Sequence, residues 1–318
     1  MKKFLKRIVY LLIFLFVFLN TICAFQAYHF SHFYNNVALQ NPQQMGFLGK
    51  AGVVLFGKEY AKSKVVDSLN VPHSNIIIKT EDGLKLAAWK ATHSIVKPVK
   101  AKGTIIMFHG HSDSRSNIIK EAEAFYNMGW NLVMVDFRAH GQSEGNTCSV
   151  GYFEVKDVKA AYDYVTATGE KNIVLWGVSM GAAAITKTMN DYAYVKPSKI
   201  ILEMPFATML DAVEGRVRIM DLPEEPFGIL LAFWGGTEMG IWIFANKPEA
   251  YARKITCPVL LQWGKKDPRV TEKETNDIYA NLRSSQKTLV EYNDVGHESL
   301  CIHAHEKWIQ SVATFLNR

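Results

Sequence analysis

The sequence has few cysteines and little excess charge, and it contains no internal repeat. Its 4 cysteines among 318 residues fit neither a zinc-ligand spacing nor a disulfide framework. Four of the 36 basic side chains lie in the first seven residues, which leaves 32 basic against 30 acidic side chains elsewhere. A nucleic-acid-binding protein would need a clustered basic face, so we expect no nucleic-acid partner. The hydrophobic content of 48% is that of an ordinary globular chain.

A long apolar run follows the basic N-terminus. Residues 8–27 (IVYLLIFLFVFLNTICAFQA) carry no charge, and about 20 apolar residues can cross a bilayer as a helix. A signal peptide cleaved after Ala24 is the alternative, whereas bulky Ile22 disfavours lipoprotein cleavage before Cys23. We therefore expect residues 1–27 to be a membrane anchor or a signal segment. The positive-inside rule then places the rest of the chain on the extracytoplasmic side, either anchored or secreted after cleavage.

The remaining chain alternates short apolar runs with amphipathic stretches. Residues 28–70 predict a helical connector without recognisable chemistry. Continuous apolar runs such as 104–108 (TIIMF) are typical of strands buried on both faces, while 155–166 has apolar residues at helical spacing. The alternation predicts an α/β domain over residues 71–318, with a mostly parallel sheet covered by helices on both faces.

The alternation breaks between about residues 205 and 249. Helix-like apolar segments punctuated by proline and glycine predict a helical lid inserted over the ends of the strands. The stretch 227–244 is apolar enough to raise a second membrane-spanning helix. Glu238 lies inside that stretch, however, and a carboxylate is costly in lipid, which favours the lid.

A serine nucleophile is indicated by one motif in its context. Gly177-Val178-Ser179-Met180-Gly181 directly follows an expected strand and directly precedes an expected helix. G-x-S-x-G alone is a weak signal, but between a strand and a helix it is typical of a sharp turn that exposes the serine hydroxyl. The sequence therefore predicts Ser179 as a nucleophile.

A serine hydroxyl needs a base to take its proton and a third group to orient that base. His297 follows an expected strand in NDVGHES, and Asp267 follows another in WGKKDPRV, which gives the chain order serine, acid, histidine. We expect His297 as the base and Asp267 as its partner. Glu203, at the end of the strand before the lid, is an alternative acid.

Two backbone N–H groups are expected to stabilise the negative charge that forms on an attacked carbonyl oxygen. One belongs to Met180, at the start of a helix, and the other to His111, after the strand 104–108. The pattern His109-x-His111-x-Asp113 also suggests a metal site, but the final histidine of such a site is missing. We expect no metal and no cofactor.

Several stretches together are similar to the α/β-hydrolase superfamily, and within it to bacterial single-domain hydrolases of the serine aminopeptidase-like group. They read GTIIMFHGHSDS, VMVDFRAHGQSEG, IVLWGVSMGAA, PVLLQWGKKDPRV and DVGHES, and they span residues from about 74 to 318. The resemblance implies esterase, lipase, thioesterase or peptidase chemistry without a cofactor. It also implies that residues 136–143 form a structural loop, in which Ala139 stands where glycine is usual.

These expectations describe a serine hydrolase that cleaves carboxylic esters, including thioester or lipid-like acyl substrates, through an acyl-serine intermediate. An aminopeptidase or amidase using the same three residues is the alternative within catalysis. A catalytically silent binding protein is the alternative outside it, although such a protein would usually lack one of the three residues. The expected partners are a small-molecule ester or acyl substrate and a membrane contacted by the N-terminal segment.

Overall fold

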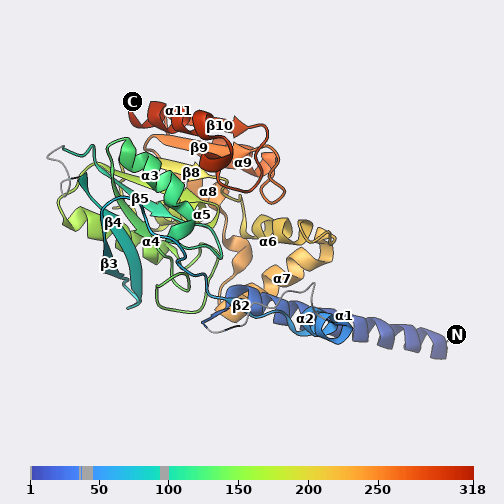
Figure 1. Cartoon of the computed structure of the whole chain (residues 1–318). Coiled ribbons are helices and arrows are strands. Elements are labelled where there is room, and N and C mark those ends of the chain that lie inside the picture. The colour runs from blue at the N-terminus through green and yellow to red at the C-terminus, as the bar shows by residue number, and fades with distance from the viewer. Residues whose placement is uncertain (1, 36, 38–45, 94–99) are drawn as a thin grey trace.

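An eight-stranded sheet forms the centre of the computed structural model, which describes residues 2–35, 37, 46–93 and 100–318 (Figure 1). The strands are His73–Lys79 (β3), Lys85–Ala91 (β4), Thr104–Phe108 (β5), Asn131–Val135 (β6), Ile173–Val178 (β7), Lys199–Glu203 (β8), Val259–Gly264 (β9) and Lys287–Tyr292 (β10). Their order across the sheet is β10-β9-β8-β7-β5-β6-β4-β3. Neighbours from β10 to β6 are parallel, whereas β4 is antiparallel to both β6 and β3. The predicted fold class is confirmed.

Helices cover both faces because side chains alternate along each buried strand. On β5, Ile105 and Met107 join one apolar cluster, and Ile106 and Phe108 join the other. The first cluster receives α3 (Ile119–Asn127), α10 (Leu300–His303) and α11 (His305–Leu316). The second receives α4 (Val155–Ala167), α5 (Met180–Asp191) and α9 (Glu272–Asn281). The apolar residues of β5 therefore pack into two hydrophobic cores, one on each face of the sheet.

The N-terminal segment forms one helix of 30 residues, α1 (Lys2–Ser31), which is about 45 Å long at 1.5 Å per residue. Its first half is exposed and extends away from the body (Figure 1). Its second half buries Cys23 and Ala27, and Asn20 Oδ1 accepts a hydrogen bond from Trp234 Nε1 at 3.1 Å. The apolar helix is thus both a projecting segment and a packed element.

The connector after α1, which was predicted to be helical, also contains two short strands. Phe33–Tyr34 (β1) pairs in parallel with Tyr60–Ala61 (β2), and Phe47–Phe56 (α2) lies between them in the chain. Phe33 is buried and Phe33 N donates to the carbonyl oxygen of Asn146 at 2.8 Å. The connector is therefore attached to the loop that precedes α4.

The segment between β8 and β9 is helical. It comprises α6 (Met209–Arg218), α7 (Glu224–Met239), η4 (Ile243–Ala245), α8 (Pro248–Tyr251) and η5 (Ala252–Lys254). Helix α7 packs on both α6 and the second half of α1, with Gly235 facing Ala27. By length and composition α1 is the one described helix that could cross a membrane alone, and α7 passes the same test only together with the segment after it, across a bend of 104°.

Strand β7 runs into α5 through a turn with no spare space. Ser179 has φ 53° and ψ −114°, a conformation that a non-glycine residue adopts only under strain. A Cβ on Gly177 would lie 2.6 Å from the carbonyl carbon of Gly181. A Cβ on Gly181 would lie 2.9 Å from the carbonyl oxygen of His109 and closer still to that of Phe108. Both glycines allow α5 to cross the ends of β5 and β7.

This geometry predicts that Gly181→Ala lowers the free energy of unfolding by about 1–3 kcal/mol, because the new methyl group meets backbone rather than a movable side chain. Urea denaturation of the full-length protein measures this loss. Gly52→Ala on α2 is the matched control: no atom lies within 4 Å of its Cβ, so it should be neutral or stabilising. Equal stability of the two variants would contradict the account of the turn.

Candidate active site

The structure brings Ser179, His297 and Asp267 together at the carboxyl ends of β7, β9 and β10. His297 Nε2 lies 3.0 Å from Ser179 Oγ, and His297 Nδ1 lies 2.6 Å from Asp267 Oδ2. Both distances are within hydrogen-bonding range. A serine, an imidazole and a carboxylate in this chain of contacts can move a proton from the serine hydroxyl to the imidazole.

Asp267 is held so that one oxygen faces His297. Its Oδ1 accepts backbone hydrogen bonds from Arg269 at 2.7 Å and Val270 at 2.9 Å, which leaves Oδ2 for the imidazole. The carboxylate is fully buried. Because the turn after β9 supplies both donors, the backbone fixes the direction of the carboxylate, and the carboxylate fixes the ring of His297.

Glu203, the alternative acid, lies elsewhere. Its Oε1 accepts hydrogen bonds from the indole nitrogens of Trp176 and Trp308 at 2.9 and 2.7 Å, and from Gln262 Nε2 at 3.0 Å. None of its hydrogen bonds among the described residues reaches His297. Burial, and then the nearby Glu121 carboxylate, raise the pKa of Glu203 to about 8. Glu203 is therefore a buried group whose hydrogen bonds tie β8 to β9 and α11.

The two residues expected to supply the oxyanion donors border the same cavity as Ser179. Met180 begins α5, and His111 lies in the turn after β5, where a Cβ on Gly110 would be 3.8 Å from Ser179 Cβ. Neither backbone N–H donates to a protein acceptor within the described residues. A backbone N–H that has no protein acceptor is available to donate to an oxygen that gains negative charge.

The imidazole of His111 carries a further contact that the sequence did not reveal. Phe30, near the end of α1, stacks on the ring at a centroid distance of 4.5 Å. Burial, and then the Arg216 guanidinium, hold the pKa of His111 well below its usual value. His111 is therefore a neutral ring, and the last turn of α1 lies directly against the turn that carries its N–H.

Two cavities meet at Ser179. The larger, about 390 Å³, is bordered by polar and charged groups that include Asp113, Glu121, Arg216, Arg269 and His297. The smaller, about 40 Å³, is lined by apolar side chains, mostly of the lid and including one from α1, together with His111, Arg216, Arg269 and His297. Its apolar lining consists of Phe30, Val150, Met180, Phe206, Met209, Ala212, Val213 and Val270. The site can thus hold a molecule with one polar and one apolar end.

The metal pattern is not assembled as a ligand set. His109 Nδ1 lies 2.7 Å from the carbonyl oxygen of Gly110, and its Nε2 accepts from the backbone N–H of Phe137 at 3.1 Å. Both ring nitrogens of the first expected ligand are therefore occupied. No group of three or more candidate ligand side chains is assembled within the part of the chain that the structure describes.

The loop 136–143 has the structural role that the resemblance implies. Asp136 forms a buried ion pair with Arg115 and accepts from Gln142 N at 2.8 Å. Ala139 has φ 64°, a left-handed conformation that favours glycine. The loop packs behind His109 and His111, and so supports the turn after β5.

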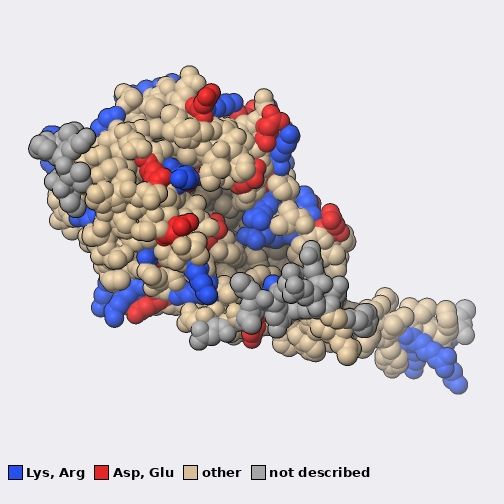
Figure 2. All heavy atoms as spheres, in the orientation of Figure 1, with Lys and Arg blue, Asp and Glu red and all other residues tan. Residues whose placement is uncertain are grey.

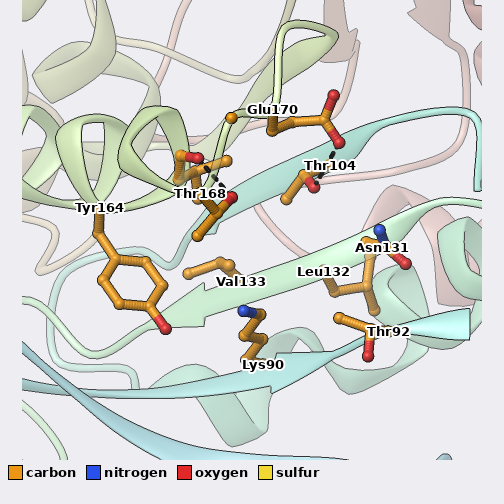
Figure 3. Close-up of a pocket in the computed structure, with 11 residues that line it drawn as sticks. Lys90, Thr92, Thr104, Asn131, Leu132, Val133, Tyr164, Thr168 and Glu170 are labelled. Atoms are coloured by element: carbon orange, nitrogen blue, oxygen red, sulfur yellow. Dashed lines mark hydrogen bonds between the residues drawn. The ribbon is translucent and has the colours of Figure 1, made fainter. Parts of the chain in front are cut away.

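A different hollow lies at the opposite edge of the sheet (Figure 3). It measures about 310 Å³ and lies near the first residues of β5 and β6, Thr104 and Asn131. Glu170 accepts from Thr104 Oγ1 at 3.2 Å across one side of it. None of the three residues expected to act in catalysis borders this hollow. In open α/β sheets ligands bind at the carboxyl ends of the strands, so we assign no catalytic role to it.

Comparisons with known proteins agree with this fold. A family model described as serine aminopeptidase, S33, matches residues 99–221. The alpha/beta hydrolase domain-containing protein WAV2 of Arabidopsis thaliana is 26% identical over 273 residues, covering 79% of this chain and 80% of WAV2. The lysophosphatidylserine lipase ABHD12 of Danio rerio is 21% identical over 243 residues, covering 68% of this chain and 60% of the lipase.

The esterase Pf2001 of Pyrococcus furiosus superposes with a TM-score of 0.67 at 21% identity, over 91% of this chain and 97% of the esterase. The chain belongs to the α/β-hydrolase superfamily. This membership confirms the resemblance and supports hydrolase activity.

In this hydrolase the charged groups Arg216 and Arg269 also border the cavity at Ser179, and sequence reasoning did not select them. Arg269 lies two residues after Asp267, but no sequence signal places Arg216 at the cavity.

The position of Glu203 predicts a pH effect on stability. Its pKa in the folded hydrolase exceeds the value of 4.5 expected for an unperturbed glutamate, so the unfolded chain loses this proton at lower pH. The Glu203 contribution to the free energy of unfolding should therefore fall as pH rises from about 4.5 to about 8. Glu203→Gln keeps an oxygen that accepts hydrogen bonds and removes the titration.

Chemical denaturation across this pH range measures the effect. The stability of the wild type minus that of Glu203→Gln should decrease as pH rises, by at most about 1.4 kcal/mol per pH unit. Glu306→Gln, at an exposed position of α11, should give a curve parallel to that of the wild type. If the Glu203→Gln curve is also parallel to the wild type, Glu203 does not have the raised pKa.

Proposed function

We propose that this hydrolase cleaves carboxylic esters through an acyl intermediate on Ser179. The observation that carries the proposal is the continuous pair of contacts from Ser179 Oγ to His297 Nε2 and from His297 Nδ1 to Asp267 Oδ2. His297 takes the Ser179 proton while Oγ attacks the carbonyl carbon. The N–H groups of Met180 and His111 then donate to the oxyanion.

Collapse of the tetrahedral intermediate breaks the bond to the alcohol oxygen. His297 gives its proton to that oxygen, the alcohol leaves, and the acyl group remains on Ser179. Water then attacks the acyl carbon, and His297 takes its proton as it took the proton of the serine. The bond from the acyl carbon to Ser179 Oγ then breaks, and His297 returns the proton to Oγ, which releases the acid and restores Ser179. Asp267 stays ionised throughout, orienting the ring and stabilising the imidazolium.

Amide cleavage on the same residues is the second candidate, because the matching family model is described as serine aminopeptidase. An aminopeptidase must bind a free amino group beside the scissile bond. Asp113 and Glu121 border the cavity, but burial raises the pKa of both carboxyls, which weakens each as a partner for an ammonium group. The apolar side chains that border the second cavity, and the relatives described as an esterase and a lipase, favour an acyl ester.

The catalytic proposal predicts separable effects of two substitutions. A fluorophosphonate probe should label the wild type and leave Ser179→Ala unlabelled, because only an activated serine reacts. Asp267→Asn should reduce kcat on a p-nitrophenyl ester by roughly 10⁴-fold with the fold intact, because His297 then adopts the wrong tautomer. Glu203→Gln serves as the control acid and should have a far smaller effect. The reverse ranking would identify Glu203 as the partner, and labelling of Ser179→Ala would refute the nucleophile.

We also propose that α1 is an uncleaved membrane anchor with the catalytic domain on the extracytoplasmic side. The helix as a whole has the length and composition of a spanning segment, and its first half is exposed. Cleavage after Ala24 would remove Asn20 and Cys23, which contact or are buried against the body. These packed residues favour retention of the segment over secretion after cleavage.

The anchor predicts that full-length protein sediments with membranes and resists carbonate extraction. Deletion of residues 2–17 should release a soluble protein that still hydrolyses a soluble ester, since the deleted part of the helix is exposed. Deletion of residues 2–27 should lower its thermal stability further, since it uncovers α7. Recovery of soluble mature protein whose N-terminus lies near Phe25 would instead show a cleaved signal.

A further inference from the structure

Two arginines converge on the cavity at Ser179 from different elements. Arg216 belongs to α6 of the lid, and Arg269 to the loop after β9. Both border the larger cavity and the smaller one, together with Ser179 and His297. In Figure 2 basic side chains are visible over α6, at the edge of a hollow on this face of the molecule.

Among the residues that the structure describes, neither guanidinium pairs with a carboxylate. Within the described ranges no acidic side chain comes within the 4.0 Å of an ion pair to Arg216 or Arg269. The neighbouring Arg218, by contrast, pairs with Glu224 at 2.8 Å. Asp113 borders the same cavity and attracts both arginines through space, but it forms no ion pair with either.

The surroundings of Arg216 orient it without neutralising it. Its Nη2 lies 3.3 Å from Nδ1 of the neutral His111 ring, and its guanidinium stands over the ring of Phe30 at 5.2 Å. Burial, and then the charge of Arg269, lower the pKa of Arg216 to about 10. Two like charges near one cavity repel, and an anion between them would offset that repulsion.

We propose that Arg216 and Arg269 form an anion-binding subsite for the substrate of this site, an acyl ester whose alcohol part carries a phosphate or a carboxylate. The inference rests on the proposed ester hydrolysis and adds the substrate class. The acyl group extends along the apolar side chains that border the smaller cavity, and the anionic group occupies the 390 Å³ cavity, which both guanidinium-bearing residues border. Guanidinium groups bind phosphate and carboxylate oxygens through paired, charge-assisted hydrogen bonds.

Kinetics on three esters with the same acyl chain test this subsite in full-length protein in detergent. One ester has glycerol phosphate as its alcohol, one has a hydroxycarboxylate, and one has uncharged glycerol. The ratio of kcat/KM for an anionic ester to kcat/KM for the neutral ester should exceed one in the wild type. It should fall roughly 10–100-fold in Arg216→Gln and in Arg269→Gln, the loss expected for a charged hydrogen bond. The better of the two anionic esters identifies the group.

Arg253→Gln is the matched control, because Arg253 is exposed and its Nε donates to Asn281 Oδ1 at 3.0 Å. Its ratio should equal that of the wild type. If Arg216→Gln and Arg269→Gln lower turnover of the anionic and neutral esters equally, the arginines only support the fold and the subsite is refuted. A wild-type ratio of one or less refutes it as well.

A binding measurement separates failure of this subsite from failure of ester hydrolysis. Calorimetry with Ser179→Ala protein should show that an alkyl phosphate or an alkyl carboxylate binds more tightly than an alkyl glycoside of equal chain length. Adding Arg216→Gln should remove that preference. If the preference is present but no ester is cleaved, the subsite stands and the proposed reaction fails. If esters are cleaved without any preference for anions, the reaction stands and the subsite fails.

Discussion

The turn between β7 and α5 is the constraint on which the site depends. It places Ser179 in a strained backbone conformation, and it exists only because Gly177 and Gly181 let the helix approach neighbouring backbone. Ser179 N also donates to the carbonyl oxygen of Glu203 at 2.7 Å, which ties the turn to the end of β8. Because the three strands β7, β9 and β10 are parallel and belong to one sheet, the residues after their carboxyl ends reach the serine from the same edge.

Much of this arrangement can be predicted from the sequence, since short apolar runs and their order define the sheet. The same order places the residues after β7, β9 and β10 at one edge, which is why Ser179, Asp267 and His297 were predicted to meet. The choice between Asp267 and Glu203 could not be made from position alone, because Glu203 ends one strand near the serine and Asp267 follows another. The structure separates them through hydrogen bonds, which bind Glu203 to two tryptophans and Asp267 to His297.

Contacts between distant segments were beyond sequence reasoning. Nothing in the local pattern indicates that Phe30 stacks on His111, or that Arg216 of the lid reaches the same cavity. The apolar helix α1 could be read only as a segment for a membrane, whereas its second half also packs against α7. The lid therefore has two neighbours, the cavity at Ser179 and the helix proposed as an anchor.

The central claim is that Ser179 carries the acyl group during turnover. The most direct test is to quench the full-length protein with acid while it turns over a slowly deacylated ester, digest it, and measure peptide masses. The account predicts the acyl mass on the peptide containing Ser179, and its removal by hydroxylamine. Consumption of the ester with no acylated peptide, or with the acyl group on another residue, would contradict it.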